Sequence, residues 1–158
     1  GRPSGLQIES WVVENVSRGG FGAVLKNIPE EWLKAGALVA MQPEGGENWL
    51  LGVIRRYHRE GQMEARAGIQ ALATKVIAIE LRARQSSSYA AAAGTPALML
   101  LDGNEPNEFR VVLPPATFNP REEMEYLRDS RRYMLTPVAL IEKTGDYELV
   151  RYRQREIG

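Results

Sequence analysis

The sequence predicts an all-β protein made of two antiparallel β domains. Short runs of apolar and β-branched residues alternate along the chain with turns rich in Gly, Asn, Asp and Pro, the pattern of hairpin-connected strands. Apolar spacing compatible with an α-helix occurs only in short segments. A stretch dominated by Ser, Ala and Gly, residues 86–95, separates the two halves.

The first half is expected to consist of strands joined by short turns. Alternating residues over 6–13 lead into a glycine-rich turn, and Ala23–Leu25 forms the other arm of that hairpin. Pro29, the acids after it and Gly36 predict one or two helical turns over 28–36. The other strands of this half are expected at 37–41, 49–57, 63–72 and 76–81, with a bulge or sharp bend at Gly52 in the second of them. The Ala and Glu content toward the end of this half also permits a helix, but the alternation of Val76, Ala78 and Glu80 favours a strand.

The second half also has the pattern of antiparallel strands. Two pairs of strands are expected, at 97–101 with 109–113 and at 133–142 with 147–152, the latter around the turn Lys143–Asp146. The segment 122–128 fits a helix or a strand. We therefore expect a β-barrel domain over 1–85, a linker or loop over 86–95, and a second small antiparallel β domain over 96–158.

Composition narrows the classes of function. The chain of 158 residues has no cysteine and one histidine, His58, so thiolate and histidine-rich metal sites are excluded and a histidine-dependent catalytic set is not expected. Basic and acidic residues number 20 each, which disfavours nucleic acid as a partner. No apolar run has the length of a membrane span. We expect a cytoplasmic, non-enzymatic protein with no catalytic residues, metal ligands or cofactor.

The candidate site is the turn Asn15-Val-Ser17-Arg18-Gly19-Gly20 together with the arginines at the end of the strand 49–57. Glycines allow a close backbone approach, and Asn and Ser supply hydrogen-bonding groups. The turn resembles the [Asp/Asn]-x-Ser-x-x-Gly signature of PilZ domains, the small β-barrel receptors for cyclic di-GMP. The later segments Gly36-Ala-Leu-Val, Gly52-Val-Ile-Arg55 and Gly68-Ile-Gln-Ala-Leu follow in the order and spacing of that family, so the resemblance covers about residues 6–85.

The resemblance implies a PilZ-like split β-barrel in a bacterial signalling protein that senses cyclic di-GMP and relays the signal to an unidentified protein partner. The ligand-binding residues would be Asn15, Ser17, Arg18, Gly19 and Gly20. Two further arginines, Arg55 and Arg56, are candidates for the same barrel mouth.

A second family motif, Arg-x-x-x-Arg ahead of the first barrel strand, has no match at that place, where Arg2 is the sole arginine before Asn15. Either the motif precedes residue 1 in a longer protein, or it has been lost. In the second case the alternative function is that of a degenerate PilZ-like barrel, which binds no nucleotide and acts as a protein–protein interaction adaptor. The same spacing occurs at Arg55/Arg59, Arg128/Arg132 and Arg151/Arg155, as expected by chance in a chain with so many arginines.

Overall fold

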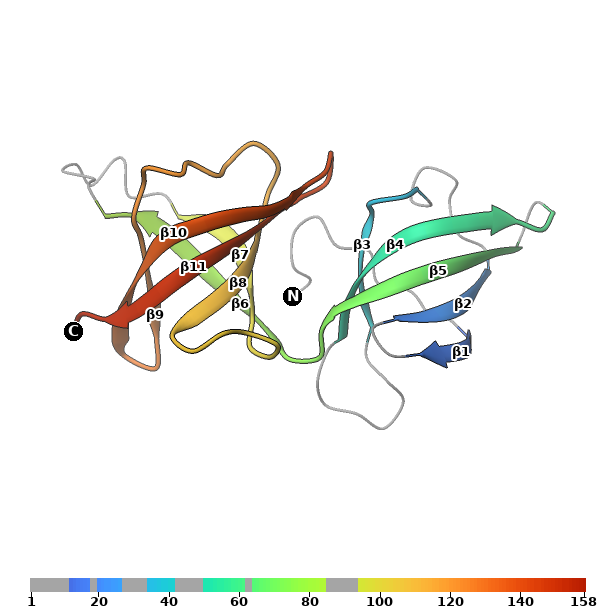
Figure 1. Ribbon diagram of the computed structural model, residues 1–158, viewed down its shortest axis with the longest axis horizontal. Coiled ribbons are helices and arrows are strands. Elements are labelled where there is room, and N and C mark those ends of the chain that lie inside the picture. Colours follow the sequence, from blue (N-terminus) through green and yellow to red (C-terminus); the bar gives the residue numbers. More distant parts are fainter. Residues whose placement is uncertain (1–11, 18–19, 27–33, 42–49, 62–63, 85–93) are drawn as a thin grey trace. The chain divides into compact units, whose positions relative to one another are not determined.

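The computed structural model of the protein describes residues 12–17, 20–26, 34–41, 50–61, 64–84 and 94–158. The chain divides into two compact units, Gly1–Val76 (unit 1) and Ile77–Gly158 (unit 2). All regular secondary structure in the described residues is β-strand, and the strands are paired antiparallel (Figure 1). The predicted all-β fold class is thus confirmed.

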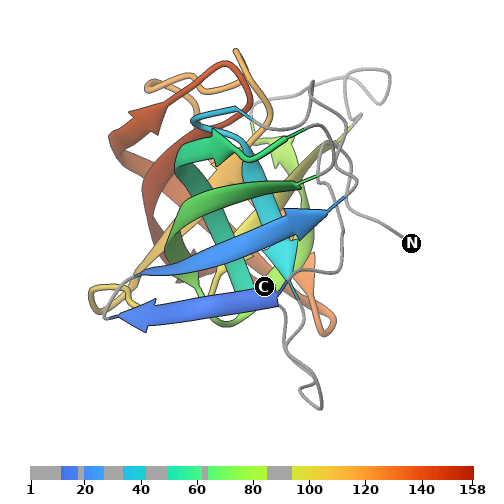
Figure 2. The ribbon, with the colours of Figure 1, turned by 90° about the vertical axis from the view of Figure 1, so that its right-hand side faces the viewer.

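Unit 1 contains a five-stranded sheet with the strand order β1-β2-β5-β4-β3. Figure 2 shows β1 and β2 in blue, followed by β5 and β4 in green. The strands span β1 (Val12–Ser17), β2 (Gly20–Lys26), β3 (Leu38–Met41), β4 (Leu50–Arg59) and β5 (Glu64–Ala73).

The two faces of this sheet are seen most clearly on β5, where buried Ala65, Ala67 and Ile69 alternate with exposed Arg66 and Gln70. This period of two places one set of side chains in the core and the other in solvent. Unit 1 therefore has a solvent-facing surface on the Arg66 and Gln70 side of β5.

Strand β4 carries two irregularities in its pairing with β5, between Leu51 and Gly52 and between Ile54 and Arg56. The first is the bulge or bend that Gly52 predicts. A helical turn was expected over residues 28–36, and its part up to residue 33 lies outside the described residues. The remainder is a turn with Gly36 at φ 92°, whose N–H donates to the Ile54 carbonyl at 2.7 Å.

Unit 2 is a closed six-stranded barrel with the order β10-β11-β8-β7-β6-β9. Its strands span β6 (Val76–Ala83), β7 (Thr95–Leu100), β8 (Glu108–Leu113), β9 (Met124–Arg128), β10 (Arg131–Lys143) and β11 (Glu148–Glu156). The ambiguous segment 122–128 is thus a strand from Met124 onward. Five of the six barrel strands come from residues 95–156, and only β6 comes from the segment 1–85 that was expected to form a PilZ-like barrel.

The two units divide between Val76 and Ile77, about ten residues before the linker that the sequence predicted at 86–95. Strand β6, expected in the first domain, pairs with β9 through Arg82–Glu125 and Ala83–Met124. It contributes Ile79 and Leu81 to the barrel core. Thr95, expected in the linker, already begins β7.

The barrel interior is filled by aliphatic residues and two tyrosines. Leu135, Val111 and Val150 are fully buried, and Tyr152 packs edge-on against Phe118 with ring centroids 6.4 Å apart. Buried Glu148 closes one end, where its Oε1 accepts hydrogen bonds from the backbone N–H groups of Thr117 and Phe118 at 3.0 and 2.9 Å. A buried carboxylate satisfied in this way holds the loop after β8 on the barrel.

Candidate functional site

The structure describes five of the seven residues expected to bind a ligand, while Arg18 and Gly19 lie outside the described residues. Asn15 and Ser17 are on β1, Gly20 begins β2, and Arg55 and Arg56 are on β4. The two β4 residues are exposed. All five belong to the sheet of unit 1, so the pairing of its strands decides which of them are neighbours.

Strand register joins Asn15 and Arg56 through two glycines. Asn15 pairs with Gly22 of β2, Gly22 pairs with Gly68 of β5, and Gly68 pairs with Arg56 of β4. Positions paired in succession across a sheet form one row on one face. We call Asn15–Gly22–Gly68–Arg56 the glycine row.

A second row lies beside the glycine row. Ser17 pairs with Gly20, Gly20 with Gln70, and Gln70 with Val53. Ser17 follows Asn15 by two residues along β1, and Gln70 follows Gly68 by two residues along β5. The two rows are therefore neighbours on the same face of the sheet. The predicted ligand-binding residues on β1 and β2 therefore lie in the same rows as Gly68 and Gln70 of β5. Neither of these two β5 residues was predicted to contact the ligand.

The Arg56 side chain lies directly over Gly68. A Cβ atom built on Gly68 would be 2.7 Å from Arg56 Nε and 2.9 Å from Arg56 Cγ, closer than real Cβ contacts allow. Glycine is thus required for this side-chain position. Among the described residues, Arg56 has no hydrogen-bond or ion-pair partner.

Arg55 occupies the second irregularity of β4, and this places it beside Arg56 on the exposed side. The register passes from Ile54 to Arg56, so Arg55 is the extra residue of a bulge. Its Nε donates a hydrogen bond to Gln70 Oε1 at 2.7 Å. Two successive arginines are therefore exposed at the glycine row, although alternation in a regular strand would turn one of them toward the core.

The exposed arginines give this face groups that can bind an anion. Arg66, on the same side of β5, is held by Glu60 through an Nε–Oε1 contact of 3.0 Å, which leaves Arg56 as the guanidinium without such a partner in the described sheet. Arginine suits phosphate and guanine recognition because its planar fork donates two parallel hydrogen bonds and its face stacks on bases. Of the two glycines, Gly68 is covered by the Arg56 side chain, and Gly22, paired with Gly68, adds no side chain of its own to this face.

Metal and membrane sites receive no support from the described part of the chain. There, no group of three or more His, Asp or Glu side chains is placed to hold a metal ion. Nor does any helix within it have the length and apolar character needed to cross a bilayer.

Sequence reasoning missed Gly22, Gly68 and Gln70 as members of the site. Gly68 and Gln70 were visible only as parts of a strand, since their place opposite Gly22 and Gly20 depends on the pairing of distant segments. No protein-family model matches the chain, and no curated protein and no solved structure is similar to it at a significant level. The fold and the site therefore define a class, a two-unit β protein with an exposed arginine–glycine face.

Proposed function

We propose that unit 1 is a non-enzymatic receptor module of the PilZ kind, which binds cyclic di-GMP at the glycine row. The observation that supports this most strongly is the register that puts Asn15 and Arg56 in one row on either side of Gly22 and Gly68. Asn15 belongs to the signature-like turn, whereas Arg56 comes from a strand about 40 residues later in the sequence. The pairing of the strands places both positions in one row, with β2 and β5 between them.

The ligand would use both features of the row. A guanine ring or the ribose-phosphate backbone would lie on Gly22, beside the Arg56 guanidinium that covers Gly68, because Gly22 has no Cβ to hold it away. Arg56, which has no partner among the described residues, would donate to a phosphate or stack on a base. Bound ligand would then change the surface that unit 1 offers to a protein partner.

Calorimetric titration with cyclic di-GMP tests the proposal. Arg56→Ala removes one charge-assisted contact worth about 1.5–3 kcal/mol, so binding is expected to weaken by about 10- to 100-fold. Ser17→Ala is expected to have a smaller effect. Arg121→Ala, which removes an exposed arginine from unit 2, is the matched control and is expected to bind as the unaltered protein does.

A folded protein that takes up no cyclic di-GMP at high micromolar concentration would contradict the receptor function. Binding that survives unchanged in Arg56→Ala would contradict the site but not the ligand. Circular dichroism on each variant separates a lost contact from a lost fold.

A second candidate function, a protein–protein interaction adaptor without nucleotide binding, is favoured by one feature of unit 2. Val138, Leu140 and Ile141 of β10 are 37%, 43% and 46% exposed. Val138 and Ile141 fall at the two register shifts of β10 against β11, so bulges turn them outward. Exposed apolar residues gathered on one strand are typical of a binding surface.

Affinity capture with the purified protein as bait distinguishes this candidate. The double variant Val138→Ser/Ile141→Ser is expected to lose bound proteins that Arg56→Ala retains, because only the former changes the apolar strand. Capture of the same proteins by both variants would count against the adaptor function.

A further inference from the structure

A cluster of arginines on the outer face of the barrel is independent of the proposed cyclic di-GMP site. Its centre is Met134 of β10, which is only 3% exposed although it is not part of the core cluster that contains Leu135. Its neighbour Leu135 points into that core, so Met134 faces outward. Arginine side chains cover it instead of solvent.

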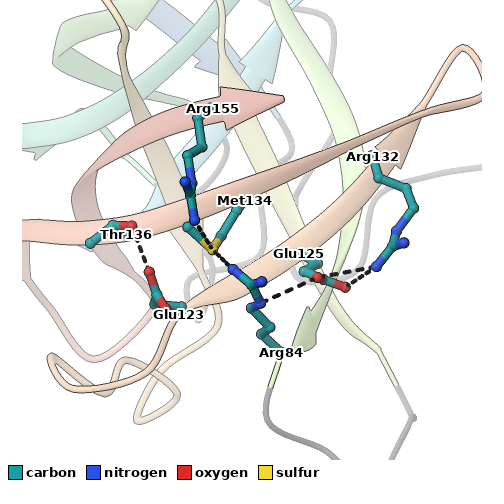
Figure 3. A network of polar contacts seen from close by, with 7 residues as sticks. All are labelled: Arg84, Glu123, Glu125, Arg132, Met134, Thr136 and Arg155. Carbon is teal, nitrogen blue, oxygen red and sulfur yellow. Dashed lines mark hydrogen bonds and ion pairs between the residues drawn. The ribbon is translucent and has the colours of Figure 1, made fainter. Parts of the chain in front are cut away.

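Two guanidinium groups converge on the Met134 sulfur. Arg84 Nη1 donates to Met134 Sδ, and Arg155 Nη2 lies 3.8 Å from the same atom. Figure 3 shows the two side chains reaching it from opposite sides. A thioether is a weak hydrogen-bond acceptor and carries no charge, so it does not neutralise either arginine.

Of the nearby carboxylates, Glu125 is shared between Arg132 and Arg84, and two others are engaged with groups outside the proposed cluster. Glu125 accepts two hydrogen bonds of 3.2 Å from Arg132 Nη2, and its Oε1 is 3.8 Å from Arg84 Nε (Figure 3). Glu123 Oε2 accepts a hydrogen bond of 3.0 Å from the Thr136 hydroxyl. Glu156 is paired with Arg131 at 3.4 Å.

Arg153 adds a third guanidinium to the cluster. It pairs across the strands with Thr136, as Arg155 does with Met134, so the two arginines follow one another on the same face of β11. A hollow of about 480 Å³ lies here, lined by Asn107, Thr136, Arg153, Gln154, Arg155 and Glu156. Within the described residues, neither Arg153 nor Arg155 has a carboxylate partner.

We propose that Arg84, Arg153 and Arg155 form a phosphate-binding site on the outer face of the barrel. A phosphate group carries up to two negative charges and several acceptor oxygens. It can therefore accept hydrogen bonds from guanidinium forks that approach from different sides, whereas a planar carboxylate meets one fork edge to edge. The approach of Arg84 and Arg155 from opposite sides of Met134 fits the phosphate.

The methionine beneath the arginines provides a direct reporter. The chain has five methionines, so the methyl group of Met134 can be followed by NMR in protein labelled with [¹³C-methyl]methionine. Inorganic phosphate, added at constant ionic strength against sodium chloride, is expected to shift the Met134 signal to saturation. Met99, fully buried in the barrel core, should not move.

Matched variants assign the response to the arginines. In Arg84→Gln/Arg155→Gln the saturable shift should vanish, since each lost contact weakens binding by roughly tenfold or more. Arg84→Lys/Arg155→Lys keeps the charge but not the fork and should bind with intermediate affinity. Arg128→Ala removes an arginine that pairs with Asp129 in the β9–β10 turn and should bind as the unaltered protein does.

The titration of Met134 with phosphate can support or contradict the proposed site. A shift that does not saturate, that chloride reproduces, or that survives in the double Gln variant would overturn the proposal. If the phosphate response is present, adenosine monophosphate and vesicles containing phosphatidylglycerol identify its source. A nucleotide response that the double Gln variant loses indicates a small-molecule ligand, and a vesicle response lost in the same variant indicates a lipid headgroup.

Discussion

In unit 1 the side chain of Arg56 lies over Gly68, and in unit 2 the side chain of Arg110 lies over Gly103. The surroundings of these two arginine–glycine pairs differ. Arg110 Nη2 donates to the Asp102 carbonyl at 2.8 Å and its Nε to Asn104 Oδ1 at 3.3 Å. Burial lowers the pKa of Arg110, and the charge of Asp102 opposes that effect. Arg56 is exposed and has no such partners in the described chain.

Arg110 has a structural role that Arg56 does not share in the described part of the chain. Arg110 holds the loop between β7 and β8, in which Gly103 has φ 74° and Asn104 Nδ2 also donates to the Leu100 carbonyl at 2.8 Å. Its hydrogen-bonding capacity is used within the loop, whereas Arg56 has no hydrogen-bond partner among the described residues. An exposed guanidinium without a partner in the described part of the chain has the chemistry to bind an external anion.

The largest expected effect tests whether the two units are independent in stability. Leu135 is fully buried in the barrel, so Leu135→Ala should lower the free energy of unfolding of unit 2 by about 2–5 kcal/mol. All three tryptophans lie within residues 1–76, so tryptophan fluorescence follows unit 1 during urea unfolding. Far-UV circular dichroism follows both units.

The circular dichroism transition of the barrel should therefore move to lower urea in Leu135→Ala, while the fluorescence transition stays in place. Leu127→Ala, at a position 66% exposed, is the control and should change stability by less than about 0.5 kcal/mol. An equal shift of both transitions would mean that the units unfold together.

The next effect contrasts the two arginines directly. Arg110→Met should cost about 1.5–3 kcal/mol, because it leaves the Asp102 carbonyl and Asn104 without their charged donor. Arg56→Met should change stability by less than about 0.5 kcal/mol. Urea unfolding measures both, and a similar cost at the two positions would remove the distinction between them.

Two glycines of unit 1 give a third contrast. A Cβ on Gly52 would be 2.7 Å from Ile69 Cγ2 and 3.1 Å from the Gln70 carbonyl oxygen, so Gly52→Ala should cost about 1–3 kcal/mol by overpacking. Gly68→Ala meets only the flexible Arg56 side chain and should be nearly neutral for stability. It should instead displace Arg56 and weaken the binding of cyclic di-GMP. Fluorescence-detected unfolding and calorimetry measure the two consequences separately.

The smallest effect concerns the tyrosines of the barrel. Burial raises the pKa of Tyr126 from 10.0 to about 12 and also raises that of Tyr152. The folded barrel thus keeps these protons at a pH where the unfolded chain loses them. The associated stability is complete below about pH 10 and falls as the pH rises toward 12 and beyond.

Urea unfolding at several alkaline pH values checks this dependence. In Tyr126→Phe the loss of stability above pH 10 should be smaller, since Tyr152 alone then contributes. The variant should also be less stable by about 0.5–1.5 kcal/mol at neutral pH, because the Tyr126 hydroxyl no longer donates to Gln154 Oε1. A pH dependence identical to that of the unaltered protein would contradict the assignment to Tyr126.

The sequence was informative where local patterns decide structure. The strands β4, β7, β8, β10 and β11 were expected near their observed positions, because apolar runs bounded by turn residues suffice to locate them. The irregularity at Gly52 was also expected, and the structure confirms it. The β9–β10 turn was not recognised. It uses Asp129 and Ser130 at φ 51° and 65° in place of the Asn-Gly that marks such turns.

Long-range pairing set the limit of the sequence analysis. Alternation cannot reveal that Arg82 pairs with Glu125, which moves β6 into unit 2. Nor can it reveal the bulge at Arg55, because inserting one residue changes which side chains share a face. The glycine row depends on the register of three strand pairs, β1–β2, β2–β5 and β5–β4. Local sequence patterns do not determine these registers.

The position of β6 determines how the protein can be divided. Strand β5 ends at Ala73 and β6 begins at Val76, so Thr74 and Lys75 are the only residues between the two sheets. A peptide ending at residue 85 would carry β6 away with unit 1. The β7 and β9 edges that flank β6 would be left unpaired in the remaining barrel, and such edges promote aggregation. A cut between Ala73 and Val76 instead leaves every strand of both units with its own sheet.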